Sequence, residues 1–394
     1  MTAQPADGIT STQDITSTRD ITSTKDVTST GASQASQPGA VLTATAPDAA
    51  DAAIPAEAKR PIALLLPGQG AQYPGMASGL YGWEPAFTEA LDELFAHLGS
   101  HGARIRSAWL AGSPAAIDDH WLSQPLLFGI GFAMGRMLQS RGLEVSALLG
   151  HSAGAYGAAV LAGVMSLPDA AHVLMERVAA FSHAPVGGMY AVAATPEQVA
   201  HRLTERVVIA AVNSPGQVMI SGPEPEVTGV AEAMKSDGFT VVQAKARRGF
   251  HSPYLEPYCA RAVPLLAGMR LHAPRIPIIS AYVPGPLTAD HATDPAFWAM
   301  QPARPVLFGP ALDALLDRGP HLLVETGPGQ RLSTLARRHP DVFSGRSAVL
   351  PLLGRRPGPP NADRRNMIRA LAALGHHSHR IHVLGGPTRA DAAA

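Results

Sequence analysis

Short, strongly apolar runs bounded by Gly and Pro recur along the chain from residue 61 onward. Residues 62–66 form such a run and are closed by Pro67-Gly68, which is typical of a buried strand that enters a loop. Residues 145–149 predict a second buried strand, and residues 153–163 predict a helix directly after it. Residues 122–141 have helical spacing and end at a glycine, the residue favoured after a helix. These patterns predict an α/β domain.

A second group of elements lies between residues 187 and 251. Strands are expected at 189–194, 207–212, 218–221 and 239–243, with helices near 196–205 and 225–236. Their order, β-α-β-β-α-β, matches the ferredoxin-like pattern. The larger domain then resumes with a helix near 255–267, a strand near 276–280, a helix near 310–317 and a strand at 322–325.

The predicted fold class is therefore α/β. We expect a large α/β-hydrolase-like domain with a parallel sheet, formed by residues 59–186 and 252–355, and a small ferredoxin-like domain inserted at 187–251. Residues 356–394 contain two Gly-Pro pairs and an Ala-rich end, and we interpret them as a loosely ordered tail with a short helix near 365–374.

The first 58 residues differ in composition from the rest of the chain. A six-residue unit repeats from Gly8 to Gly31, in the forms GITSTQ, DITSTR, DITSTK and DVTSTG. One aliphatic residue in six supplies too little apolar area for a core, so disorder is the expectation for residues 1–58.

Composition narrows the function classes. The chain has 394 residues, of which 46% are hydrophobic, with 31 Lys+Arg against 31 Asp+Glu. This balance gives no overall field that would favour nucleic acid or an anionic membrane as a partner, and aromatic residues are sparse. The single cysteine, Cys259, excludes an internal disulfide, and no cluster has metal-ligand spacing. No secretory signal or 18-residue apolar run occurs, so we expect a cytoplasmic protein.

The strongest chemical signal is the sequence Gly150-His151-Ser152-Ala153-Gly154. It fits G-x-S-x-G between a predicted strand and a predicted helix, the setting in which a serine is exposed on a tight turn as a nucleophile. The alternative is a chance glycine-rich turn, since Gly and Ala are abundant in this chain.

A nucleophilic serine needs a base at neutral pH, and sixteen histidines are available. His151 adjoins the serine but should point elsewhere, which favours a structural role. His251 lies where the chain returns from the inserted domain, a position that lines clefts. The Pro67-Gly68-Gln69-Gly70 loop follows a strand and offers backbone N–H groups for an oxyanion. The alternative, a phosphate-binding loop, lacks the Lys-Ser/Thr of that motif.

Together these segments resemble the malonyl-CoA:acyl-carrier-protein transacylases and the acyltransferase domains of polyketide synthases. The match runs from about residue 61 to 353. It rests on the following motifs: PGQGAQ (67–72), SQP (123–125), GHSAG (150–154), Arg177, NSPGQVMISG (213–222), GFHSP (249–253) and ETGPGQ (325–330).

The resemblance implies roles for individual residues. Ser152 would carry the acyl group, His251 would be its base, and the backbone N–H groups of Gln69 and Ala153 would hold the oxyanion. The backbone carbonyl of Gln301 would orient the histidine, in place of a triad carboxylate. Residues implied to bind the substrate are Arg177, Phe250 and Gln124.

Two of these positions imply which acyl group the protein would carry. Arg177 would grip a malonyl carboxylate through two parallel hydrogen bonds, and the alternative is an ordinary surface arginine. Phe250 resembles the residue of malonyl-selecting enzymes, since its ring fills the space that an α-methyl group would use. Ala153 and Ala155 depart from the family pattern, and the resulting GHSxGA resembles stand-alone, trans-acting acyltransferases and the transacylase component of malonate decarboxylase.

The resemblance also implies partners and alternatives. The partners would be acyl-CoA and an acyl carrier protein that brings its own phosphopantetheine, with no tightly bound cofactor. Lys245, Arg247 and Arg248 could attract either partner, or form a solvated basic edge. Three other functions remain: transfer of a bulkier acyl or aminoacyl group between carrier proteins, hydrolysis of acyl groups from carrier proteins, and non-catalytic binding of a carrier protein.

Overall fold

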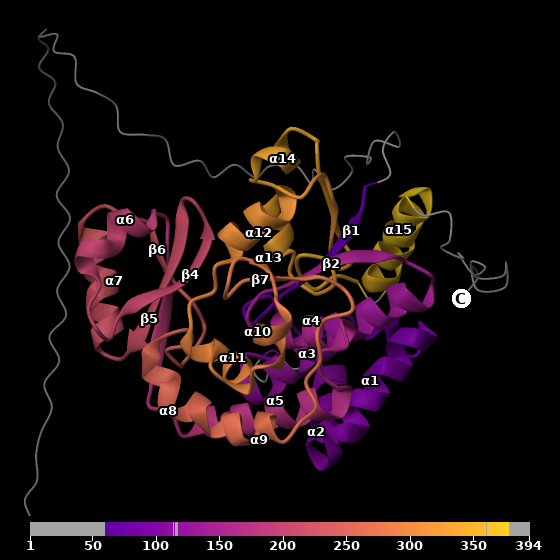
Figure 1. Cartoon of the computed structure of the whole chain (residues 1–394), viewed down its shortest axis with the longest axis horizontal. Helices are drawn as coiled ribbons and strands as arrows, with labels where there is room; N and C mark the ends of the chain where they lie inside the picture. The colour runs from indigo at the N-terminus through magenta and orange to yellow at the C-terminus, as the bar shows by residue number, and fades with distance from the viewer. Residues whose placement is uncertain (1–59, 113, 115–116, 360, 378–394) are drawn as a thin grey trace, which may run out of the picture. The chain divides into compact units, whose positions relative to one another are not determined.

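A computed structural model describes residues 60–112, 114, 117–359 and 361–377 of the chain (Figure 1). The predicted disordered segment, residues 1–58, lies outside the described residues. The larger sheet has six strands in the order β10-β9-β1-β2-β7-β8. All neighbours in it are parallel except β7 and β8, which pair antiparallel. The strands are β1 (Ile62–Leu66), β2 (Val145–Gly150), β7 (Ile278–Ser280), β8 (Gly285–Pro286), β9 (Leu322–Glu325) and β10 (Ala348–Pro351).

Strand β1 is buried along its whole length and divides the core into two layers. Ile62, Leu64 and Leu66 face one layer, and Ala63 and Leu65 face the other, as the period of two in a strand requires. The first layer is covered mainly by α1 (Pro85–His97), α3 (His120–Ser140), α4 (Gly154–Leu161) and α5 (Leu167–Ser182). The second is covered by α12 (Phe308–Leu316) and α13 (Arg331–Ala336). Both faces are apolar because helices cover both.

The long helix α3 follows α2 (Gly99–Leu110) and is buried over most of its 21 residues. Asp119 caps its N-terminus by accepting the backbone N–H of Trp121. Gly129 leaves room for the Leu94 side chain of α1, which lies 2.5 Å from where a Cβ atom would stand. Within the described ranges no helix, α3 included, combines the length and apolarity needed to cross a membrane.

Residues 187–243 form a separate antiparallel sheet in the order β4-β5-β3-β6 (left in Figure 1). Its apolar layer against α7 (Glu226–Ser236) includes Val218 and Ile220, whereas Met219 points to the opposite face. A bridge between Ala211 and Val306 joins this sheet to the larger domain. The other elements are β3 (Gly187–Val192), α6 (Pro196–Val199), β4 (Val208–Ser214), β5 (Gln217–Pro223) and β6 (Val241–Gln243).

The predicted α/β fold class, with a parallel sheet and a ferredoxin-like insertion, is confirmed. The continuous helix expected near 255–267 is wrong. The chain forms short turns there, including α8 (Glu256–Cys259) and α9 (Val263–Ala267), separated by 3-10 segments. Pro257 and Pro264 account for this, because proline lacks the N–H that an uninterrupted helix would use.

The expectation of a loosely ordered tail from residue 356 is also wrong for its first part. Helix α15 (Ala362–His377) has 16 residues, and Met367, Leu371 and Leu374 are buried in the main core. Its start is held by the Asp363 carboxylate, which accepts the backbone N–H of Gly79 at 3.2 Å. Residues 378–394 lie outside the described part of the chain.

The packing of α15 leads to a stability prediction. Met367→Ala should lower the free energy of unfolding by about 2–5 kcal/mol, because the Met367 side chain is fully buried and its removal leaves a cavity. Ile368→Ala removes a similar side chain that is 49% exposed, so it should change stability by no more than about 0.5 kcal/mol. Urea unfolding of both variants measures the difference, and equal values would mean that α15 is not part of the cooperative core.

Candidate active site

Ser152 stands on the tight turn between β2 and α4. Its φ angle is +53°, in the left-handed region that costs a non-glycine residue of the order of 1–3 kcal/mol. The flanking glycines make the turn possible. A Cβ atom at Gly150 would lie 2.5 Å from the Cα of Ala155, and one at Gly154 would lie 2.0 Å from the carbonyl oxygen of Leu66. No side chain fits at either position.

The loop after β1 packs directly against this turn. The backbone N–H of His151 donates to the Leu66 carbonyl at 2.9 Å. Gly68 lies so close that a Cβ atom there would be 2.9 Å from the Cβ of Ser152. Among the described residues, the N–H groups of Gln69 and Ala153 have no hydrogen-bond partner. Two unpaired donors beside a serine can stabilise a negative oxygen that develops there.

Ser152 and His251 meet although they are 99 residues apart in sequence. The Oγ of Ser152 lies 2.8 Å from Nε2 of His251. The other ring nitrogen, Nδ1, is 3.2 Å from the carbonyl oxygen of Gln301 and 3.0 Å from that of Arg304. Carbonyls only accept, so Nδ1 carries the hydrogen and Nε2 offers its lone pair to the serine hydroxyl.

His251 is held in place by its backbone as well as by its ring. Its φ angle is +62°, and its N–H donates to the Pro302 carbonyl at 2.6 Å. Burial, together with the charges of His151 and Arg177, lowers the pKa of His251 to about 4, although the two carbonyls partly oppose the shift. The imidazole is therefore neutral at pH 7 and can accept a proton.

His151, the neighbour of the serine in sequence, is bonded to another residue, although it lines the same cavity as Ser152. Its Nε2–H donates to the amide oxygen of Asn213 at 3.1 Å, and burial lowers its pKa. This hydrogen bond ties the turn to strand β4 of the inserted sheet. The structure thus places His151 in a structural contact, in line with its expected role.

Ser152 and His251 open into a cavity of about 360 Å³ between the two sheets. The predicted residues Gln69, Ala153, Arg177, Phe250 and Gln124 all line it, whereas Gln301 contributes only its carbonyl behind the histidine. Sequence reasoning assigned no role to several other lining residues. These include Gln72, Met189, Met219, Gln243 and Arg331.

Arg177 projects from α5 into this cavity and is only 6% exposed. Its guanidinium lies 4.7 Å from the ring centre of Tyr156 and 5.9 Å from that of Phe181, so it is held by cation–π contacts. Its Nε and Nη1 atoms have no hydrogen-bond partner in the described part of the chain. A buried cation with unpaired donors is suited to binding an anion.

Gln124, from α3, reaches the loop after β1. Its Nε2 donates to the side-chain oxygen of Gln69 at 3.3 Å, while its own oxygen is buried without a partner among the described residues. Gln69 is therefore connected to the helix that lines the inner part of the cavity, and Gln124 keeps an unused acceptor.

Phe250 packs edge-on against Phe181, with ring centres 5.5 Å apart. The preceding Arg248 donates from Nε to the Phe181 carbonyl at 2.8 Å and from Nη2 to the Ser182 carbonyl at 3.3 Å. Arg248 thus satisfies carbonyls at the C-terminus of α5, where a cation is favoured. It is not a free charge at the cleft mouth. Lys245, which lines the cavity, pairs with Asp118 at 2.8 Å.

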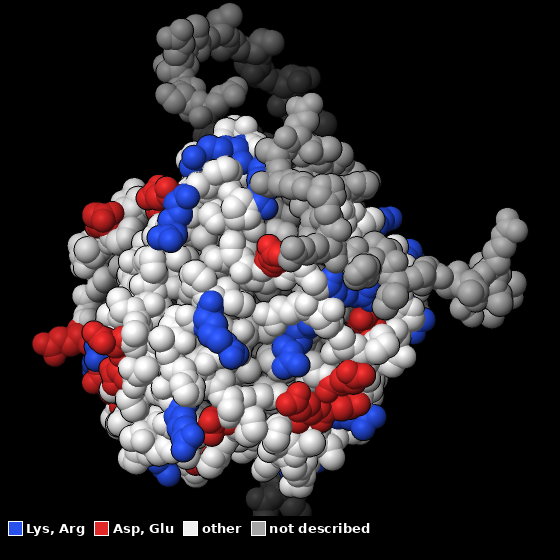
Figure 2. All heavy atoms as spheres, turned by 45° about the vertical axis from the view of Figure 1, so that its right-hand side comes forward, with Lys and Arg blue, Asp and Glu red and all other residues white. Residues whose placement is uncertain are grey.

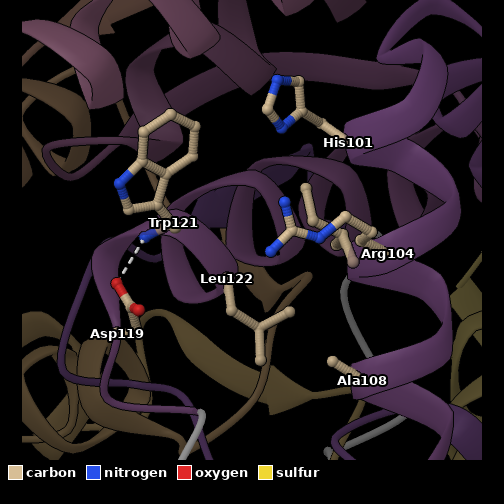
Figure 3. Close-up of a pocket in the computed structure, with 7 residues that line it drawn as sticks. His101, Arg104, Ala108, Asp119, Trp121 and Leu122 are labelled. Atoms are coloured by element: carbon tan, nitrogen blue, oxygen red, sulfur yellow. Dashed lines mark hydrogen bonds between the residues drawn. The ribbon is translucent and has the colours of Figure 1, made fainter.

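A second cavity, of about 400 Å³, lies between α2 and α3 (Figure 3). His101 stacks on Trp121 at its edge, and Asp119 and Arg104 add charge. Among the described residues that line it there is no serine or cysteine. On the face shown in Figure 2 both charge signs are interspersed, in keeping with the zero net charge.

The fold and the site define a protein with an activated serine between an α/β domain and a ferredoxin-like insertion. A family model described as "acyl transferase domain" matches residues 64–359. The chain is 34% identical over 281 residues to mycoketide-CoA synthase of Mycobacterium tuberculosis, covering 71% of this chain and 7% of that protein. It is 34% identical over 285 residues to the spectinabilin polyketide synthase system protein NorB of Streptomyces orinoci, covering 70% and 13%. The chain thus spans only a small part of the length of these relatives.

Two solved structures show the same architecture. The acyltransferase domain of SpnD, in complex with 2-(pent-4-yn-1-yl)malonyl, has a TM-score of 0.75 at 30% identity and covers 83% of this chain and 79% of its own. A malonyl-CoA:acyl carrier protein transacylase from Xanthomonas oryzae has a TM-score of 0.68 at 29% identity and covers 78% and 98%. The chain belongs to the acyltransferase domain family.

The pKa of His251 leads to a prediction about pH. The lone pair on Nε2 is present above a pKa of about 4 and is lost as the pH falls through that value. Labelling of Ser152 by a fluorophosphonate should therefore keep an almost constant rate from pH 8 to about 5.5 and fall with a midpoint near 4. A midpoint near the ordinary histidine value of about 6.5 would show that His251 is not buried as described.

Proposed function

We propose that this protein transfers an acyl group, malonyl in the first instance, from a thioester donor such as acyl-CoA to the phosphopantetheine thiol of an acyl carrier protein. The observation that carries the proposal is the 2.8 Å contact between Ser152 and a neutral His251, beside two unpaired backbone N–H groups. Family membership supports the reaction class, since the matching model is an acyltransferase domain.

The proposed first half-reaction acylates Ser152. Its Oγ attacks the thioester carbonyl carbon while the hydroxyl proton passes to Nε2 of His251. The carbonyl oxygen becomes negative and accepts hydrogen bonds from the N–H groups of Gln69 and Ala153. When the C–S bond breaks, the leaving sulfur takes the proton from His251, which leaves an acyl-serine and a free thiol.

The second half-reaction runs the same steps in reverse with a new thiol. His251 removes the proton from the phosphopantetheine thiol of the carrier, and its sulfur attacks the acyl-serine carbonyl. The serine oxygen leaves and recovers the proton from His251, so the enzyme returns to its starting state. The neutral imidazole is suited to both steps because it must accept a proton first and donate it later.

Malonyl is the proposed acyl group because of Arg177 and Phe250. The unpaired guanidinium of Arg177 can hold the carboxylate at the far end of a malonyl group. The Phe250 ring is 7% exposed and is fixed against Phe181, which limits space near the α-carbon. Ala153 has the opposite effect to Phe250, because its small side chain leaves room beside the serine. The related SpnD domain is described with a malonyl group that carries a long substituent, so a substituted malonyl is the second candidate.

The nucleophile is tested by intact-protein mass spectrometry after incubation with malonyl-CoA. The wild-type chain should gain one malonyl group, and Ser152→Ala should gain none because the bond-forming oxygen is missing. The neighbouring Ser146→Ala is a control that should load normally, since Ser146 bonds to the Ile62 carbonyl away from the cavity. Loading of Ser152→Ala would refute the proposed acyl-serine. Steady release of free malonate without any acceptor would instead indicate a hydrolase.

The role of Arg177 is tested by comparing donors. Arg177→Met should lower kcat/KM for malonyl-CoA by about 10- to 100-fold, the value expected for losing charge-assisted hydrogen bonds. It should change kcat/KM for acetyl-CoA by less than about threefold, since acetyl has no carboxylate. Arg177→Lys keeps the charge but not the paired geometry, so its kcat/KM for malonyl-CoA should lie between those of the wild type and Arg177→Met. Equal losses with both donors would contradict carboxylate binding.

A further inference from the structure

A second arginine, Arg331, lines the active-site cavity, and the proposed mechanism gives it no role. It is the first residue of α13, directly after Gln330, whose φ angle is +52°. Its guanidinium crosses the loop after β1: Nη1 lies 3.1 Å from where a Cβ atom of Gly70 would stand. Gly70 adjoins Gln69, so this cation is beside the loop that faces Ser152.

The side chain of Arg331 has no hydrogen bond or ion pair with any residue that the structure describes, although its guanidinium packs beside Gly70. Its side chain is open to solvent, yet surrounding protein lowers its pKa. Exposure and a lowered pKa occur together when the guanidinium lies in a recess, where solvent reaches it but protein atoms surround it. A cation in such a recess lacks both a carboxylate partner and full hydration, and it attracts anions.

Arg331 and Arg177 reach the same cavity from different elements, Arg331 from α13 and Arg177 from α5. A thioester whose acyl carboxylate lies at Arg177 must leave the serine in another direction. Met219 and Ala211 of the inserted sheet line the cavity together with Arg331 and supply an apolar wall for an extended chain.

The backbone that carries Arg331 is firmly anchored. The buried carboxylate of Glu325 accepts the N–H groups of Leu332 at 3.2 Å and Ser333 at 2.7 Å. On the other side, Nε2 of Gln330 donates to the Leu353 carbonyl at 2.9 Å. A backbone that is already fixed on both sides does not have to be ordered when the side chain binds a ligand, so the segment loses less entropy.

We propose that Arg331 binds the phosphate of the phosphopantetheine arm, the group that the acyl-CoA donor and the holo carrier have in common. This rests on the proposed function. The arm is otherwise uncharged between its thiol and its phosphate, so the phosphate is the one anion it can offer a cation near the mouth. A guanidinium binds phosphate through two parallel hydrogen bonds.

The test compares thioesters that differ only in the phosphate. Acylation of Ser152 is measured with malonyl-phosphopantetheine and with malonyl-pantetheine, for the wild type, Arg331→Met and Arg331→Lys. The matched control is Arg338→Met, which removes the same charge from an exposed position just after α13, outside the cavity. The second half-reaction is measured separately, with phosphopantetheine and pantetheine as acceptors of the malonyl group.

We expect Arg331→Met to lower kcat/KM for malonyl-phosphopantetheine by about 10-fold or more, and to leave malonyl-pantetheine within about twofold. Arg331→Lys should retain part of the preference, and Arg338→Met should behave as the wild type. If the loss of kcat/KM depends on phosphate in the first half-reaction, Arg331 binds the phosphate of the donor. If it depends on phosphate in the second half-reaction, Arg331 binds the phosphate of the carrier arm. Either result supports the proposal.

Two results would overturn the inference. Equal losses with and without phosphate would show that Arg331 supports the loop after β1 rather than a ligand, and an unchanged preference for phosphate would show that the anion binds elsewhere. Both differ from failure of the proposed function, in which the wild type would not be acylated at Ser152 by any of these thioesters.

Discussion

Backbone contact between the end of β1 and the turn after β2 is the constraint on which the site depends. The two strands are parallel neighbours, so their carboxyl ends meet at one edge of the sheet. Gly154 approaches the Leu66 carbonyl, and Gly68 approaches Ser152, at distances that exclude any Cβ atom. Because the two loops touch through backbone, the N–H groups of Gln69 and Ala153 are fixed on either side of the serine. Preorganised donors of this kind need no rearrangement when charge develops.

Most of the strands and turns that depend on local sequence pattern were predicted. The apolar run at 62–66 and the G-x-S-x-G turn each have a short-range cause, namely a buried strand and a residue in the left-handed region. The amphipathic helix α1, with Phe87, Leu91 and Leu94 buried, was not predicted, although its spacing is regular. Only the middle of α15 was predicted, as a short helix near 365–374 in a loosely ordered tail, because its flanks contain Gly-Pro pairs and its mean hydropathy is low. Its stability comes from burying Met367 and Leu374 in the main core.

Long-range contacts could be inferred only through the family resemblance. Nothing local to residues 249–253 shows that His251 reaches Ser152, since that contact depends on how the inserted sheet returns the chain. The pairing of Arg248 with the end of α5 was equally hidden, and a run of basic residues suggested a free charged edge instead. Arg331 carried no signal at all. It follows a Gly-Pro-Gly loop, and only the close approach of α13 to Gly70 brings it to the cavity.

In the described part of the chain His251 has no carboxylate partner, which is consistent with the charge of the proposed substrate. His251 is oriented by the carbonyls of Gln301 and Arg304, which are neutral acceptors. A carboxylate in their place would put a negative charge close to Arg177 and compete with the malonyl carboxylate for it. Among the described residues that line the cavity the one acid is Asp118, and it is already paired with Lys245. Arg177 and Arg331 therefore have no acid to pair with among the described residues of the cavity. The weaker base is sufficient for the proposed reaction, in which the leaving group is a thiol rather than an amine.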